Sequence, residues 1–181
     1  MMNDVVSDLV LEQEGADVFY ANGRYRYINR EIMDWVRSKA AASVRKRSRI
    51  CFHDSTSSAI HEMLIAHHLD TYVRPHKHFK TEASLLAMAG DAVVVAFTDA
   101  GEIDWVRKLS SAADEAPAFI RIPRNTYYAI LVRSEWLVFL ETMAGPFDRA
   151  ASEFGAWSPA GETGPAIERY MQELRVKTRA F

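Results

Sequence analysis

The sequence lacks the features that several classes of protein require. It holds one cysteine, Cys51, which excludes an internal disulfide framework and is typical of a reducing compartment. No apolar run approaches the roughly 20 residues that span a bilayer. The N-terminal stretch, MMNDVVSDLVLEQEG, carries acidic side chains where a secretory signal needs positive charge. We therefore expect a soluble, cytoplasmic protein without a membrane partner.

An excess of charge of one sign is also missing. The net charge is −2 at pH 7 and the pI is near 6.3, so the composition predicts no general attraction to nucleic acid. The sequence shows neither a glycine-rich phosphate loop nor a Ser-His-Asp pattern. The sequence does contain enough hydrophobic residues, 49% of 181, to form the core of a globular protein. Its length suits one domain. The expected partner is a small molecule.

Residues 1–45 are predicted to form an N-terminal extension that packs on the rest of the domain. Both ends of the extension have a helical pattern, and Asn22-Gly23 lies between aromatic-rich runs in DVFYANGRYRYI, which predicts a β-hairpin. Asn29 is expected to cap a helix in REIMDWVRSKAAASV. The apolar face of that helix would hold Ile32, Trp35, Val36 and Ala40.

Residues 46–147 have the pattern of a β-rich domain. Runs such as TYVRPHKH, AFIRIP, TYYAILV and EWLVFLET are short, rich in β-branched and aromatic residues, and separated by turn sequences. We predict a mainly β fold, an antiparallel sandwich or barrel. LLAMAGDAVVVAF is predicted to be a hairpin that turns at Gly90-Asp91. Residues 148–181 should form a loop and a helix over about 164–177, with an apolar stripe of Ile167, Tyr170, Met171 and Leu174.

The stretch RPHKHFKTE, residues 74–82, concentrates the chemically distinctive side chains. Alternate side chains of a strand point to one face, so His76 and His78 share a face. Glu82 follows a short turn and can reach back toward them if the two strands pair. Two imidazoles and a carboxylate suit iron, zinc, nickel or manganese, and ligand type alone does not select the ion. The alternative is a pair of solvated histidines.

With Gly90 eight residues beyond Glu82, this arrangement resembles the first motif of the cupins, small β-barrels that hold a metal in the barrel mouth. The sequence is more similar still to the WbuC-type cupin-fold metalloproteins, over roughly residues 27–175. That similarity rests on KAAASVRKRSRICFH, TYVRPHKHFKTEASLLAMAGDAVVVAF, GEI, IRIPRNTYYAILV and FLETMAGPFD…FGAWSPAG. It implies one cupin-type jelly-roll barrel with N-terminal and C-terminal helices and a bound metal ion.

Several positions depart from the cupin pattern. Asp70 stands where the first motif has a glycine, and the spacing from Glu82 to Gly90 is one residue longer than in the general motif. In the second motif, PRNTYY, Asn125 replaces a glycine and Tyr128 replaces a histidine ligand. Asparagine tolerates a positive φ, so we expect the turn to be kept.

Tyr128 decides which chemistry the resemblance implies. A phenol has a pKa of about 10, so it would coordinate as a phenolate only to a strongly acidic ion such as ferric iron. Otherwise the ligands implied are His76, His78 and Glu82, the facial arrangement of non-haem ferrous oxygenases. Tyr128 would then act as a proton donor.

Two further side chains are candidate site residues. His53 matches a histidine of the WbuC-type pattern, which implies a role as acid, base or substrate contact; the alternative is a histidine packed under the N-terminal segment. Arg74 shares a strand face with the two histidines. Inside a barrel mouth it would bind a substrate carboxylate or phosphate, and outside it would be solvated.

These features support two functions. One is a metal-dependent isomerase, epimerase or oxygenase; the WbuC-type resemblance implies a sugar or nucleotide-sugar substrate in surface-polysaccharide biosynthesis. The other is a non-catalytic protein that binds a sugar or organic acid beside a degenerate or empty metal site. Because exposed sheet edges need covering, we also expect a homodimer paired through the aromatic N-terminal hairpin, with Phe19, Tyr20, Tyr25 and Tyr27.

Overall fold

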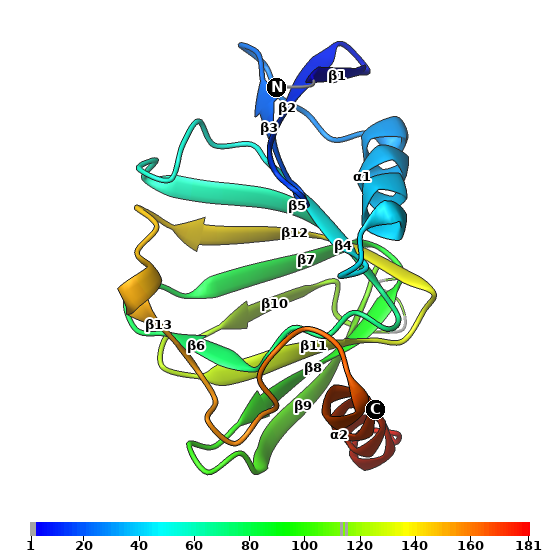
Figure 1. Ribbon diagram of the computed structural model, residues 1–181, viewed down its shortest axis with the longest axis vertical. Coiled ribbons are helices and arrows are strands. Elements are labelled where there is room, and N and C mark those ends of the chain that lie inside the picture. The colour runs from blue at the N-terminus through cyan, green and yellow to red at the C-terminus, as the bar shows by residue number, and fades with distance from the viewer. Residues whose placement is uncertain (1–2, 113, 115) are drawn as a thin grey trace.

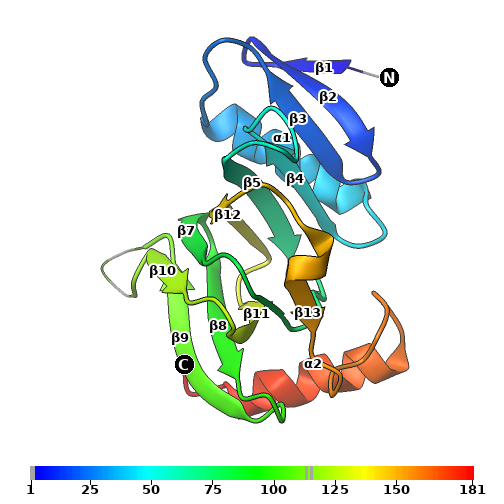
Figure 2. The same cartoon turned by 90° about the vertical axis from the view of Figure 1, so that its left-hand side faces the viewer.

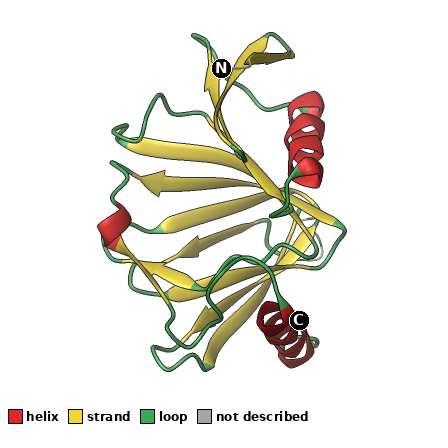
Figure 3. Ribbon diagram, viewed as in Figure 1, coloured by secondary structure: helices red, strands yellow, loops and turns green. Residues whose placement is uncertain are grey.

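The computed structural model describes residues 3–112, 114 and 116–181. Two β-sheets face each other, and one helix lies on the outer side of each sheet (Figures 1 and 3). The predicted mainly β fold with two helices is confirmed. The elements are β1 (Asn3–Val6), β2 (Leu9–Gly15), β3 (Val18–Asn22), α1 (Arg30–Ala42), β4 (Arg47–Cys51), β5 (Ile60–His68), β6 (His76–His78), β7 (Ala83–Ala89), β8 (Asp91–Phe97), β9 (Ile103–Ser110), β10 (Phe119–Ile122), β11 (Tyr127–Val132), β12 (Trp136–Ala144), the 3-10 helix η1 (Arg149–Ala151), β13 (Ser152–Phe154) and α2 (Pro165–Lys177).

The central strands form a jelly roll. β5 pairs with β12, β6 with β11, β7 with β10 and β8 with β9, as in one long antiparallel ribbon folded in half between β8 and β9. Pairing of β12 with β7 and of β11 with β8 rolls this ribbon into the orders β5-β12-β7-β10 and β6-β11-β8-β9. The predicted jelly roll is confirmed, with the strands arranged as two separate sheets instead of a closed barrel.

Alternate side chains of these strands fill the space between the two sheets. On β7, Ala83, Leu85 and Ala87 are buried in this core, whereas Ser84 and Leu86 between them face outward. The opposing sheet contributes inward-facing residues of β8 and β11 to the same core. The facing of β7 matters for the site, because a shift of one residue along the strand moves a side chain to the other side of the sheet.

The two helices form as the sequence predicts. The Asn29 side chain accepts a hydrogen bond from the Ile32 N–H at 2.9 Å, which caps α1. The buried face of α1 packs on the outer side of β4, β5 and β12, and that of α2 packs on the outer side of β8 and β11 (Figure 2). Within the described part of the chain, neither helix is long and apolar enough to cross a membrane.

The N-terminal segment forms strands, so two predictions for it are wrong. Residues 9–15 form β2 instead of a helix, and residues 23–29, directly after Asn22, form no strand that could complete a hairpin. Tight turns lie instead at Ser7-Asp8, where both residues have positive φ, and at Ala16-Asp17 between β2 and β3. β3 then pairs in parallel with β4 and extends the larger sheet to eight strands. Phe19 packs on Trp35 of the same chain, with ring centroids 4.8 Å apart, and the homodimer stays a prediction.

Gly90-Asp91 does not turn a hairpin, so this prediction is also wrong. β7 pairs with β10 and β12, while β8 pairs with β9 and β11, and the chain therefore crosses between the sheets at Gly90. Gly90 has a φ of 82°, and a Cβ there would lie 2.0 Å from the carbonyl oxygen of Trp136. The local sequence marks a tight turn, but pairing with distant strands decides which sheet each arm joins.

The facing of β7 can be tested with two adjacent leucines. Leu85 is fully buried, so Leu85→Ala should lower the free energy of unfolding by about 2–5 kcal/mol, since it leaves a cavity in the core. Leu86 on the outer side is 38% exposed, and Leu86→Ala should cost less than about 1 kcal/mol. Urea denaturation measures both changes. Equal losses would contradict the assigned facing.

His67 on β5 predicts a pH dependence of stability. Its ring meets the edge of Phe139 with centroids 5.2 Å apart, and burial, followed by the charge of Arg45, lowers the pKa of His67 from 6.5 to about 4. The unfolded chain then binds more protons between these pH values, so stability should fall as the pH drops from 6.5 to about 4. His67→Gln should reduce that slope in urea denaturation across this window. A slope unchanged by the substitution would show that His67 does not titrate as described.

Candidate functional site

The two histidines of RPHKHFKTE lie on β6, which is held between β11 and β13. Tyr128 of β11 and Phe154 of β13 are the direct cross-strand neighbours of His76, so the three rings form a row on one face. Ring centroids are 5.0 Å apart for His76 and His78, 5.0 Å for His76 and Tyr128, and 6.0 Å for His76 and Phe154. Tyr128 belongs to the core between the sheets. The predicted shared face of the histidines is therefore the inward face at the rim of the sandwich.

Both imidazoles are uncharged at neutral pH. His76 Nδ1 lies 3.0 Å from the Arg74 carbonyl oxygen, and His78 Nδ1 lies 2.8 Å from the Ser152 hydroxyl. Burial lowers the pKa of His76, and it lowers that of His78 to about 4 with a further contribution from His76. A carbonyl can only accept, so His76 carries its proton on Nδ1 and keeps the Nε2 lone pair for a ligand.

Tyr128 meets a carboxyl group that the sequence analysis did not single out. Its hydroxyl donates to Glu141 Oε1 at 3.3 Å, across the space between β11 and β12. Burial, and then the carboxylate of Glu141, raise the pKa of Tyr128 well above its usual value, and burial also raises the pKa of Glu141. Tyr128 is therefore a neutral phenol. The sequence did hold one sign that Glu141 faces inward. Glu141 alternates along β12 with the apolar residues Phe139 and Met143, and the three side chains share the inward face.

Glu82 lies apart from the histidines, on the outer side of the larger sheet. It directly precedes β7 and has the outward facing of Ser84. Its carboxylate accepts a hydrogen bond from Arg121 Nε at 2.7 Å and a second one from the same guanidinium. Among the described residues there is no group of three or more His, Cys, Asp or Glu side chains that could hold a metal ion. The arrangement therefore does not fit a metal centre of two histidines and one glutamate.

The position of Glu82 follows from the longer spacing to Gly90. Counting back from Gly90 by the general cupin spacing reaches Ala83, which begins β7, faces inward and is 1% exposed. The chain thus has a methyl group at the inward position and its carboxylate one residue earlier, on the opposite side. Asn125 has a φ of 63°, which confirms that the turn of the second motif is kept without its glycine.

The other two candidates already have protein partners. His53 stacks on His61 with ring centroids 4.1 Å apart, and its Nδ1 accepts from the Glu62 N–H at 3.2 Å. Arg74 donates to the Ser158 hydroxyl at 3.1 Å and to the Gly155 carbonyl at 3.0 Å. The guanidinium of Arg74 thus holds the segment after β13 in place. Roles of His53 and Arg74 in contacting a substrate stay predictions.

Comparison with known proteins gives a family match without an activity. A family described as "Domain of unknown function (DUF6016)" matches residues 28–109, and no curated protein matches the sequence. Similar solved structures include procruciferin, an 11S globulin from Brassica napus (17% identity, 49% of this chain and 21% of that chain, TM-score 0.40). They also include an oxalate decarboxylase from Lactobacillus farciminis in complex with formate (19% identity, 54% and 27%, TM-score 0.42).

A third similar structure is an uncharacterized protein with a double-stranded β-helix domain from Klebsiella pneumoniae (12% identity, 60% of this chain and 84% of that chain, TM-score 0.46). The present chain spans only 21% of the globulin and 27% of the decarboxylase. At these identities and TM-scores the likenesses assign no activity. The jelly roll is established by the strand pairing of the protein itself.

The position of the carboxylate predicts how metal affinity responds to mutation. In the double variant Glu82→Gln, Ala83→Glu, the carboxylate moves to the inward side of β7, the side that the histidines also face. Because partners outside the ligand shell alone change affinity about 10–100-fold, an added ligand should raise the affinity for Zn²⁺ at least about tenfold over Glu82→Gln alone. Competition with a chromophoric chelator measures this change.

The matched control carries Ala83→Gln in place of Ala83→Glu, because glutamine has the same size without the charge. We expect the control and the single variant Glu82→Gln to bind zinc as the unaltered protein does. Loss of zinc affinity in Glu82→Gln alone would mean that Glu82 is a ligand after all.

Proposed function

We propose that the protein binds a small, uncharged, hydroxyl-rich molecule at the rim of the jelly roll, around His76, His78 and Tyr128. The observation that carries this proposal is the outward position of Glu82, which leaves two neutral imidazoles and a neutral phenol at the inward rim, with the Glu141 carboxyl group already engaged by Tyr128. A charged ligand would meet no opposite charge from these three groups. Their hydrogen-bonding atoms favour a polar but neutral partner.

A sugar fits the chemistry of this site. The Nε2 atom of His76 offers an acceptor for a hydroxyl group, and Ser152 and Tyr128 add hydroxyl groups nearby. Phe154 is 56% exposed at the rim, so its ring can cover the apolar face of a bound sugar. The WbuC-type resemblance suggests, by association alone, that such a sugar belongs to surface-polysaccharide biosynthesis.

A metal-dependent enzyme is the second candidate, and one observation favours it. A histidine that binds a metal commonly donates its other ring N–H to a carbonyl or carboxylate, as His76 does to Arg74. His76 and His78 would then be joined by Tyr128 in holding iron, zinc, nickel or manganese, with His53 or Arg74 near the substrate. Such an ion would supply Lewis-acid or oxidative chemistry.

Titration of metal-free protein with sugars tests the first candidate. After treatment with a chelator, the protein is titrated with neutral monosaccharides and with the matching uronic acids, and NMR follows the ring signals of His76 and His78. We expect saturable binding of a neutral sugar and weaker binding of its acid. His76→Ala should weaken binding at least about tenfold, since one hydrogen-bonded partner is lost.

The control is His68→Ala. His68 is the last residue of β5, and its ring packs on Trp136 instead of on the rings of the site. It should leave the sugar titration unchanged. If no sugar binds the metal-free protein, and binding appears only after one of the four ions is added, the metal-dependent candidate replaces the first.

A further inference from the structure

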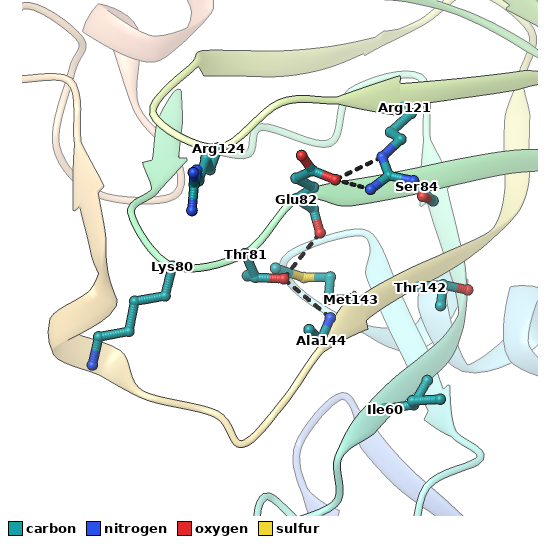
Figure 4. Close-up of a pocket in the computed structure, with 10 residues that line it drawn as sticks. All are labelled: Ile60, Lys80, Thr81, Glu82, Ser84, Arg121, Arg124, Thr142, Met143 and Ala144. Carbon is teal, nitrogen blue, oxygen red and sulfur yellow. Dashed lines mark hydrogen bonds and ion pairs between the residues drawn. The ribbon is translucent and has the colours of Figure 1, made fainter.

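A pocket lies on the outer side of the larger sheet, opposite to the side that the histidines face. It has a volume of about 370 Å³ and is formed by the segment before β7, the end of β10 and the end of β12 (Figure 4). Ser84 and Thr142, which are cross-strand neighbours, line it. Their sequence neighbours Leu85 and Glu141 face inward, so the sheet itself separates this pocket from the proposed sugar site.

The charges around this pocket are unbalanced. Arg121 pairs with Glu82, and Lys80 pairs with Asp148 at 2.8 Å between Nζ and Oδ2. Arg124 also lines the pocket, and within the described part of the chain no hydrogen bond or ion pair engages its guanidinium. Among the charged side chains that line the pocket, Arg124 is therefore the one left without a partner in the described part of the chain.

The position of Arg124 is fixed by the turn between β10 and β11. The next residue, Asn125, has a φ of 63°, and its N–H donates to the carbonyl oxygen of His78 at 2.8 Å. Opposite Arg124, the pocket has both kinds of surface that a small organic anion needs. Ser84 and Thr142 bring hydroxyl groups, and Ile60 brings an apolar side chain (Figure 4).

We propose that this pocket binds a small organic anion, whose carboxylate or phosphate group is held by Arg124. An arginine side chain presents a planar fork of donors that matches both groups bidentately. The volume lies within the range of about 300–1,000 Å³ found for small-molecule sites. Glu82 occupies the second guanidinium, that of Arg121, so the site accommodates one anionic group and disfavours ligands with two.

Titration with two simple anions tests this site without knowledge of the natural ligand. The protein is titrated with inorganic phosphate and with acetate at constant ionic strength set by chloride, and NMR follows the backbone amides of Ser84, Thr142 and Arg124. We expect saturable shifts confined to β7, the end of β12 and the turn that holds Arg124. The anion that saturates at the lower concentration identifies the preferred group, phosphate or carboxylate.

Arg124→Gln should weaken the binding of the preferred anion at least about tenfold, since hydrogen bonds to charged groups are lost. Arg169→Gln on α2 is the matched control, an exposed arginine outside the pocket, and should leave the titration unchanged. Because both side chains are exposed, the amide spectra should confirm that both variants fold. Shifts that do not saturate, or that are the same in Arg124→Gln, would overturn the proposal.

Discussion

Burial of alternate side chains between the two sheets is the constraint on which the rest of the structure depends. It sets the facing of every strand of the jelly roll, and on β7 it places Ala83, Leu85 and Ala87 inside. Since neighbouring residues of a strand face opposite ways, Glu82 is left outside. Moving Glu82 inward would expose the buried leucine at 85, at a cost of roughly 2 kcal/mol or more.

The facing of β7 places different chemical groups on the inner and the outer side of the larger sheet. The inner environment holds His76, His78 and Tyr128, all uncharged at neutral pH because burial disfavours their charged forms, and Glu141, whose pKa burial raises. The outer one holds paired and unpaired charges around Glu82 and Arg124, where solvent lowers the cost of ionisation. A neutral ligand suits the inner side, and an anion suits the outer side.

Patterns within short stretches of the sequence correctly predicted the two helices and the facing of the histidines. The Asn29 cap, the two helical stripes and the shared face of the histidines follow from capping and periodicity, and all three agree with the structure. The sheet to which β8 belongs, the parallel pairing of β3 with β4 and the contact between Tyr128 and Glu141 depend on contacts between segments that are separated in the sequence. A single sequence does not specify these contacts. The prediction for Glu82 failed for a different reason: the extra residue between Glu82 and Gly90 turns its side chain to the outer side of the sheet.

Thiol accessibility tests the facing of Glu82 and Ala83 most directly. In a Cys51→Ala background, which removes the native thiol, single variants Glu82→Cys and Ala83→Cys would be treated with iodoacetamide under native conditions and in urea. The structure predicts rapid native labelling of the thiol at position 82, and labelling at position 83 only after unfolding. Rapid native labelling at 83 with protection at 82 would contradict this account.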